Sequence, residues 1–292
     1  MKPAITHDST TRVFLCTALV ALAALPACAR SVGTDAGAES GVPSDGGSRA
    51  PCRADVDLGS IASRIRVEVT ESTVTVGTEW GNVWGHFFRE GERPSFDRVE
   101  YGACTAITIR DAIGASAGRV QVTVGARAFD VPSEQPPLVG YYRLFVDSTT
   151  ALAFPPGALL RFSASGDVVS PFSVEVRMPA YVPATVNDAA PGTRPTGLVG
   201  NPVRLDWPAT NDEVYAELSK GVPAPGMVAR RVMCVFDGRL GHAEIPAEAI
   251  APFGAGAMFV VVGGSCRNAV TAGNQSIGVN VVHGPGRGMD LR

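Results

Sequence analysis

The chain has 292 residues and a net charge of -3 at pH 7, with 45% hydrophobic and 18% charged residues. That length is ample for burying a hydrophobic core. The near-balanced charge argues against a nucleic-acid partner, because such partners require a clustered basic face. We therefore expect a folded protein of modest surface charge.

The chain opens with an uninterrupted apolar run from Val13 to Leu25, preceded by the basic residues Lys2 and Arg12. As a helix this run would span about 20 Å, which is short of the roughly 30 Å hydrocarbon core of a bilayer. A basic start, a short apolar centre and an exit of small residues are typical of an export signal. We therefore predict a signal peptide over residues 1–27.

Two cleavage sites overlap at the end of this signal. Leu25-Pro26-Ala27-Cys28 is similar to a bacterial lipobox, in which the cysteine becomes the lipidated first residue, although proline is unusual at its second position. Ala27-Cys28-Ala29 instead fits ordinary signal peptidase, which would remove Cys28 and leave a secreted or periplasmic soluble protein. Residues 28–51 are rich in Gly, Ser, Ala and Asp, which predicts a disordered tether. Because a tether suits an anchored protein, we predict a lipid on Cys28 and attachment to the outer membrane of the cell envelope.

Four cysteines follow the tether: Cys52, Cys104, Cys234 and Cys266. An even number in an exported chain favours disulfides over free thiols. Four cysteines allow three pairings, and proximity in the sequence favours Cys52–Cys104 and Cys234–Cys266. No histidine stands at metal-ligand spacing from a cysteine, so we expect neither a zinc site nor a cofactor.

From residue 64 onward the apolar period is two rather than 3.6. The segments Val120–Val124 and Ile277–Val281, for example, alternate apolar with other residues. This alternation is typical of antiparallel strands with one buried face, and frequent Gly and Pro clusters separate the strands as in β-sandwiches. The only helical turn that we expect lies at Pro246–Ala251. The predicted fold class is therefore all-β.

One hairpin shows this logic in detail. Leu160–Ala164 and Phe172–Val176 each place apolar residues on one face, and Gly166-Asp167 provides turn chemistry between them. Arg161 and Glu175 fall on the opposite faces, where we expect them to pair across the strands.

A second low-complexity stretch runs from Val182 to Pro202 and has the composition of an interdomain connection. We therefore predict a β-sandwich module over 52–181, a linker over 182–201 and a second module over 202–292. The alternative is one long loop within a single sandwich. The modules are expected to be immunoglobulin-like in architecture, although the tryptophan usually found between the two cysteines of such domains is missing.

Four segments carry a resemblance to a known class of protein. They are Leu25–Cys28, the tether, "PGALLRFSASGDVVSPFS" at Pro156–Ser173 and "CVFDGRLGHAEIP" at Cys234–Pro246. Together they resemble uncharacterised cell-envelope lipoproteins of high-GC Gram-negative bacteria with Ig-like β-sandwich modules. The resemblance implies an anchored β-protein that faces the periplasm or the outside, and it supplies no catalytic residue.

Motifs for catalysis are missing from the sequence. It contains no GxSxG, no GxxxxGK[ST] and no HExxH, and its four histidines, at positions 7, 86, 242 and 283, are scattered. We therefore predict a non-enzymatic protein with a structural or interaction role. A hydrolase whose residues meet only in space is one alternative.

A glycan- or peptide-binding module is the other alternative, located in residues 78–104. The candidate ligand-binding residues there are Trp80, Trp84, Phe88 and Tyr101. Exposed aromatic rings can stack on sugars, whereas the competing interpretation is that these rings fill the core of the first sandwich. Trp80 and Trp84 would share one strand face unless a bulge at Gly81 or Gly85 breaks the alternation.

Overall fold

The computed structural model of the protein describes residues 52–57, 63–71, 79–89, 95–110, 114–134, 140–146, 154–221 and 228–292. The predicted signal peptide, Cys28 and the tether lie outside these residues. The described chain is mostly β-strand, and its one α-helix, α2 (Ala247–Ile250), continues into the 3-10 turn η2 (Ala251–Phe253). The all-β class and the short helix are therefore confirmed.

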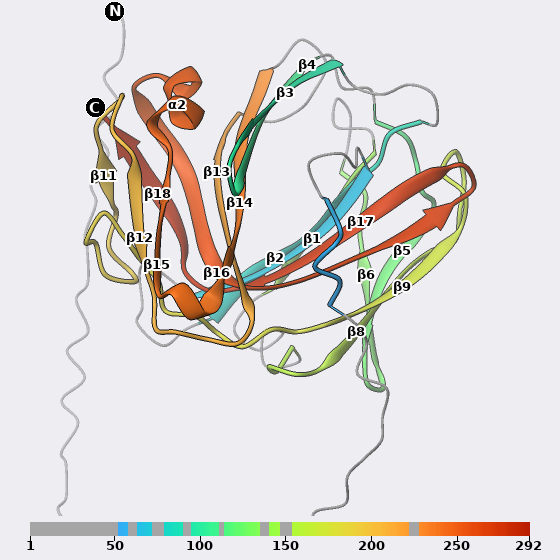
Figure 1. Cartoon of the computed structure of the whole chain (residues 1–292). Coiled ribbons are helices and arrows are strands. Elements are labelled where there is room, and N and C mark those ends of the chain that lie inside the picture. The colour runs from blue at the N-terminus through green and yellow to red at the C-terminus, as the bar shows by residue number, and fades with distance from the viewer. Residues whose placement is uncertain are drawn as a thin grey trace, which may run out of the picture. The chain divides into compact units, whose positions relative to one another are not determined.

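Eleven strands form one large sheet (Figure 1). They are β1 (Ser63–Glu71), β2 (Glu79–His86), β3 (Ser95–Tyr101), β4 (Cys104–Arg110), β7 (Tyr141–Val146), β11 (Thr196–Gly197), β13 (Glu213–Lys220), β14 (Val228–Asp237), β16 (Gly256–Ala272), β17 (Gln275–His283) and β18 (Gly286–Leu291). Nine of them follow the order β3-β4-β14-β13-β16-β17-β1-β2-β7, and β18 pairs with both β16 and β11. Neighbours in this sheet are antiparallel except for β1 with β17 and β11 with β18.

Two smaller sheets pack on the same face of the large sheet. One has the order β6-β5-β8-β9 and consists of β5 (Val120–Val124), β6 (Arg127–Val131), β8 (Leu159–Ala164) and β9 (Phe172–Arg177). The other has the order β10-β12-β15 and consists of β10 (Thr185–Val186), β12 (Val203–Asp206) and β15 (His242–Ile245). In Figure 1 the four-stranded sheet lies on the right, and β12 and β15 lie on the left beside α2.

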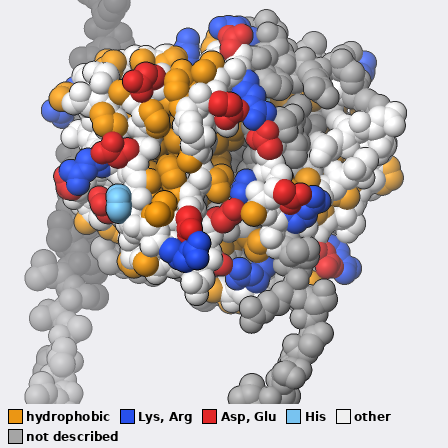
Figure 2. All heavy atoms as spheres, in the orientation of Figure 1, with side chains coloured by type: hydrophobic (Ala, Val, Ile, Leu, Met, Phe, Trp, Pro, Cys, Tyr) orange, Lys and Arg blue, Asp and Glu red, His pale blue; other side chains and the backbone are white. Residues whose placement is uncertain are grey.

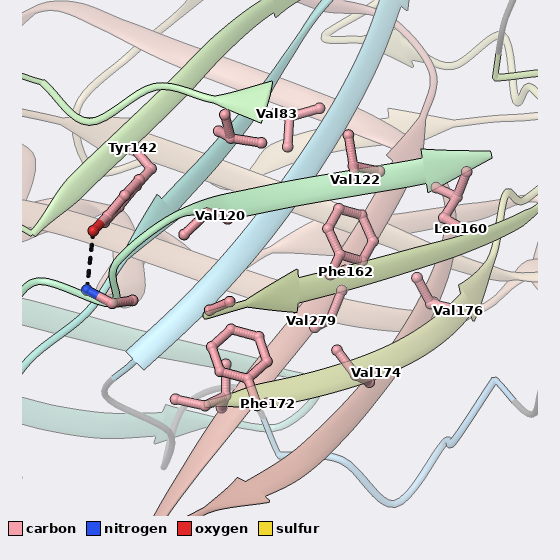
Figure 3. Packing of buried hydrophobic residues seen from close by; sticks show 14 of the residues in the cluster. Val83, Val120, Val122, Tyr142, Leu160, Phe162, Phe172, Val174, Val176 and Val279 are labelled. Atoms are coloured by element: carbon pink, nitrogen blue, oxygen red, sulfur yellow. Dashed lines mark hydrogen bonds between the residues drawn. The ribbon is translucent and has the colours of Figure 1, made fainter. Parts of the chain in front are cut away.

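The first core lies between the four-stranded sheet and the β17 part of the large sheet (Figure 3). Its buried residues include Val120, Val122, Leu160, Phe162, Phe172, Val174, Val176, Val279 and Val281. The hydroxyl of Tyr142 accepts a hydrogen bond from the Ala117 backbone N–H at 2.9 Å, which satisfies this buried polar group. The predicted hairpin is confirmed, since Arg161 stands opposite Glu175 and forms an ion pair with it.

The second core lies between the three-stranded sheet with α2 and the strands β13, β14 and β16. Cys234 is buried there in phase with Val232 and Phe236 on the same strand. Trp207 is also buried, and its indole N–H donates to the Gly238 carbonyl at 2.8 Å.

The predicted division into modules 52–181 and 202–292 is not confirmed, because the strands of both segments alternate within the large sheet. β4 pairs with β14, and β1 pairs with β17. Each core is therefore completed by a strand from the other segment: β17 lines the first core, and Cys104 of β4 lies in the second. Two sandwich layers exist, but they share one sheet rather than forming separate Ig-like domains.

The segment 182–201, predicted as a linker, is part of the folded unit. The guanidinium of Arg287, which is 2% exposed, donates from Nη2 to the carbonyl oxygens of Ala184 and Ala189 and from Nη1 to that of Ala190. Asn187 adopts a left-handed φ of 48°, and its amide accepts from the backbone of Arg204 at 2.8 Å. Since these bonds satisfy the loop's backbone carbonyls inside the protein, the segment is ordered despite its Gly- and Pro-rich composition.

All four cysteines form disulfides, but the favoured pairing was wrong. The bonds are Cys52–Cys266 and Cys104–Cys234. Register explains the second bond, because Cys104 stands directly opposite Cys234 in the β4–β14 pair. The predicted bond between Cys234 on β14 and Cys266 on β16 does not form, since β13 lies between these strands. Proximity in the sequence fails as a guide because sheet order does not follow chain order.

The pairing gives a first testable prediction. Proteolysis of the oxidised protein without reduction should yield cross-linked peptides that join Cys52 to Cys266 and Cys104 to Cys234, read by mass spectrometry. A peptide joining Cys52 to Cys104 would contradict the strand order described above.

A second prediction concerns the first core. Phe172→Ala should lower the free energy of unfolding by about 3–5 kcal/mol, because it leaves a cavity beside Phe87, whose ring centroid lies 5.8 Å away. Leu159→Ala is the matched control, since Leu159 is 43% exposed in the same hairpin and should cost less than about 1 kcal/mol. Chemical denaturation measures both, and equal midpoints would contradict the assignment of Phe172 to the core.

Candidate functional site

Of the four aromatic residues predicted as a ligand-binding surface, the structure describes the side chains of Phe88 and Tyr101 only. β2, which carries Trp80 and Trp84, pairs with β1 in continuous register from Glu79 to His86, so the backbone has no bulge at Gly81 or Gly85. The backbone alternation keeps Trp80 and Trp84 in the same phase, and their side chains lie outside the described part of the structure.

Phe88 and Tyr101 lie in different packing regions. Phe88 is 3% exposed and packs with Ile107 and Ile109, whereas Tyr101 is half-buried against the second core. Six strands separate β2 from β3 in the sheet order. The structure therefore assigns Phe88 to a hydrophobic cluster and does not unite it with Tyr101 in one exposed surface.

A different set of residues shares the face of the large sheet that points away from both smaller sheets, here called the inner face. Its apolar part is a buried cluster comprising Val56, Phe88, Ile107, Ile109, Tyr215, Ala229, Met233, Val261 and Val282. Its polar part, reached by alternation along the strands, comprises His86, Tyr141, Glu217, Arg231, Ser265, Arg267 and Asn280. On the same strands, the opposite face is almost entirely apolar.

Two hydrogen bonds link polar groups on the inner face. The hydroxyl of Tyr215 donates to Oε2 of Glu217 at 2.5 Å, and both residues are buried, at 1% and 3% exposure. The Ser265 hydroxyl donates to the amide oxygen of Asn280 at 3.1 Å, and the buried Asn280 amide nitrogen has no hydrogen-bond partner among the described residues. Buried carboxylates and amides are uncommon in folded proteins, so these groups make the inner face the candidate site of this structure.

An aromatic group lies on the same face. The ring of His86 stacks on Tyr141 with centroids 3.8 Å apart and contacts the Phe88 ring at 4.1 Å. Burial raises the pKa of the Tyr141 hydroxyl, and the positive charge of Arg231 partly opposes that shift. The apolar cluster joins Phe88, which follows β2, with Ile107 and Ile109 of β4, although five strands separate β2 from β4 in the sheet order. The sheet therefore curls around its inner face.

Residues 52–57, here called the strap, cross the inner face (Figure 1, dark blue). Cys52 is bonded to Cys266, and the Arg53 backbone N–H donates to the Arg267 carbonyl at 2.8 Å. The Arg267 guanidinium donates to the carbonyl oxygens of Val56 and Ala54. The strap is therefore bound to β16 by a covalent bond and three hydrogen bonds.

Charged side chains complete the hold on the strap. Arg267, with 7% of its side chain exposed, forms a two-pronged ion pair with Glu213 of β13. Asp57 at the other end of the strap pairs with Arg98 of β3 at 2.7 Å. The strap is therefore bound to β16 and β3, and Glu213 of β13 holds the Arg267 side chain that contacts it.

The outer surface has a mixed character. Figure 2 shows hydrophobic side chains gathered over the region of α2, β13 and β14, bordered by acidic and basic side chains. Within the described residues, no three His, Cys, Asp or Glu side chains are placed to hold a metal ion, and no helix has the length and hydropathy of a membrane span.

Sequence reasoning missed this face. β13 reads Glu213-Val-Tyr-Ala-Glu-Leu-Ser-Lys220, in which acidic and aromatic residues alternate with small or apolar ones. That alternation predicts a strand with one solvent-facing side, yet Tyr215 and Glu217 are buried. The spacing of two between Tyr215 and Glu217 predicts that their side chains lie on the same face of the strand. Their burial depends on the curl of the sheet, which the sequence of one strand does not show. The chain matches no protein-family model and no curated protein.

A third prediction tests the hold on the strap. Arg267→Met should cost about 3–5 kcal/mol of unfolding free energy, because it breaks a largely buried ion pair and removes the donors to the strap carbonyls. Arg161→Met is the matched control, since its ion pair with Glu175 is exposed and should contribute less than about 1 kcal/mol. Urea denaturation of both variants measures this difference. Equal unfolding midpoints for Arg267→Met and Arg161→Met would show that the contacts of Arg267 with the strap and with Glu213 do not stabilise the fold.

Proposed function

We propose that the chain is an exported cell-envelope protein, held to the outer membrane by a lipid on Cys28, with a structural or interaction role and no catalytic step. The observation that carries the proposal is the hold on the strap at Cys52, directly after the predicted tether. A chain anchored through its N-terminus is pulled at that point. The disulfide passes such a load to β16, a strand inside the large sheet.

Export is supported by the two disulfides. Cys104–Cys234 and Cys52–Cys266 use every cysteine that follows the tether. Disulfides persist in oxidising compartments such as the periplasm and are rare in the cytosol. Closing a loop of 130 residues, the sequence separation of Cys104 and Cys234, contributes about 4–5 kcal/mol in the chain-entropy description.

The alternative of a soluble secreted or periplasmic protein shares this oxidised fold and differs only at Cys28. If ordinary signal peptidase acts, Cys28 leaves with the leader and the tether has no anchor. Lipidation on Cys28 would bury several acyl chains at about 0.8 kcal/mol per methylene, which makes attachment effectively permanent.

The test is expression of the full chain in a Gram-negative host, followed by fractionation and mass spectrometry of the mature N-terminus. We expect the wild-type protein in the membrane fraction with an acylated Cys28, and Cys28→Ser in the soluble fraction or retained with its leader. Cys16→Ser is the matched control and should behave as wild type, because Cys16 lies inside the leader. A soluble wild-type protein that begins after Cys28 would overturn the anchor.

A further inference from the structure

The two disulfides differ in how well solvent reaches them. Cys104 and Cys234 are 1% and 0% exposed and lie in the second core. In the other bond, Cys266 is 0% exposed in the first core, whereas Cys52 is exposed. Thiol–disulfide exchange requires a thiolate to reach one of the two sulfur atoms. A thiolate in solution therefore has access to the Cys52–Cys266 bond from the Cys52 side, whereas the fold shields both sulfurs of Cys104–Cys234.

The two bonds also differ in what else joins the segments that they connect. Cys104 and Cys234 lie on β4 and β14, which pair with each other in continuous register from Arg110 and Val228 to the two cysteines. Opening this bond would leave the backbone pairing in place. Cys52 lies on the strap, which belongs to no strand. The strap therefore depends more on its disulfide than β4 and β14 depend on theirs.

The noncovalent contacts of the strap are few. Its backbone shares three hydrogen bonds with Arg267, and Val56 packs into the apolar cluster of the inner face at 5% exposure. Ordering the backbone of one residue costs about as much free energy as one hydrogen bond contributes, and residues 52–57 must all be ordered. The ion pair of Asp57 with Arg98 adds little, because the Asp57 side chain is 49% exposed. The disulfide therefore decides whether the strap stays on the inner face.

We propose that the Cys52–Cys266 disulfide is a redox switch, which a dithiol reductant opens selectively and which then releases the strap. One thiolate of the dithiol attacks the Cys52 sulfur, the S–S bond breaks, and Cys266 leaves with the bonding electron pair. The second thiolate of the reductant attacks the mixed disulfide and releases Cys52. The protein disulfide is reduced to two thiols, the dithiol is oxidised to a disulfide, and its two protons pass to Cys52 and Cys266.

Release of the strap changes the surface of the protein. Val56 leaves the cluster, so the apolar side chains that it covers on the inner face become exposed. A newly exposed apolar patch favours association with a partner. The inference thus adds a means of regulation to the proposed interaction role. It requires only the two disulfides and the strap, and it does not depend on the lipid on Cys28.

The experiment treats the oxidised full chain, purified from the Gram-negative host, with dithiothreitol in the absence of denaturant. Free thiols are first blocked with N-ethylmaleimide. The reduction is stopped with acid, dithiothreitol is removed, and the new thiols are alkylated in denaturant and quantified by mass spectrometry. We expect Cys52 and Cys266 to become thiols at least about tenfold faster than Cys104 and Cys234, because access controls the rate of exchange. Equal rates for the two pairs, or faster opening of Cys104–Cys234, would overturn the proposal.

Hydrogen–deuterium exchange tests whether the opened bond releases the strap. The Arg53 amide donates to the Arg267 carbonyl, so it should exchange at least about tenfold faster in the selectively reduced protein, while β13 keeps its protection. Cys52→Ser should show the same fast exchange without reductant. The matched control is the double variant Cys104→Ser with Cys234→Ser, which lacks the buried bond and should keep Arg53 protected.

Unchanged protection of Arg53 in the reduced wild-type protein and in Cys52→Ser would show that the other contacts are sufficient to hold the strap, and it would overturn the switch. The wild-type measurement decides this even if the double variant does not fold. None of these outcomes alters the fraction in which the wild-type protein is found, so the proposed anchor is tested separately.

Discussion

Backbone hydrogen bonding along the seventeen residues of β16 holds the two halves of this protein together. The strand pairs with β13, β17 and β18, so it lies inside the large sheet for most of its length. Its first half contributes Met258, Val260 and Val262 to the second core, and Cys266 and Ala272 of its second half lie in the first core. Since one continuous strand serves both cores, neither sandwich layer is an independent domain.

The same strand receives the N-terminal strap. Cys266 and Arg267 are consecutive, and they bind the strap by a disulfide and by hydrogen bonds to its backbone carbonyls. On a strand, consecutive side chains point to opposite faces. Cys266 therefore belongs to the first core, whereas Arg267 reaches the inner face. The strap is bound to β16 just beyond the residues that pair with β13, whose pairing ends at Glu213 and Ser265.

The two faces of the large sheet serve different purposes. One is covered by the smaller sheets and is apolar, which supplies most of the hydrophobic stabilisation. The other combines an apolar cluster with a buried carboxylate, a guanidinium, a histidine and two tyrosines. Such a face is tolerated when its buried polar groups form hydrogen bonds with one another or with a ligand. The hydrogen bond from Tyr215 to Glu217 is one of these. The curl of the sheet brings these groups together from strands far apart in its order.

Local patterns in the sequence were sufficient for the strands and for the short helix. Val120, Val122 and Val124 alternate with polar neighbours, and Arg161 faces Glu175 because a hairpin with a short connection sets its own register. The inward direction of Cys234 followed from its phase with Val232 and Phe236. Each of these features depends on residues close together in the chain, so no knowledge of the distant fold was needed.

Strand order, by contrast, was decided by tertiary packing. The pairing of β1 with β17 and of β4 with β14 joins segments more than a hundred residues apart, and no local pattern specifies such partners. The disulfides follow that order rather than sequence proximity, and the 182–201 segment is ordered only because Arg287 from β18 reaches its carbonyls. The alternation in β13 could indicate that Tyr215 and Glu217 share a face. Whether that face met water or a curled interior depended on where the other strands of the large sheet lay, because burial is a property of the assembled sheet rather than of any single strand.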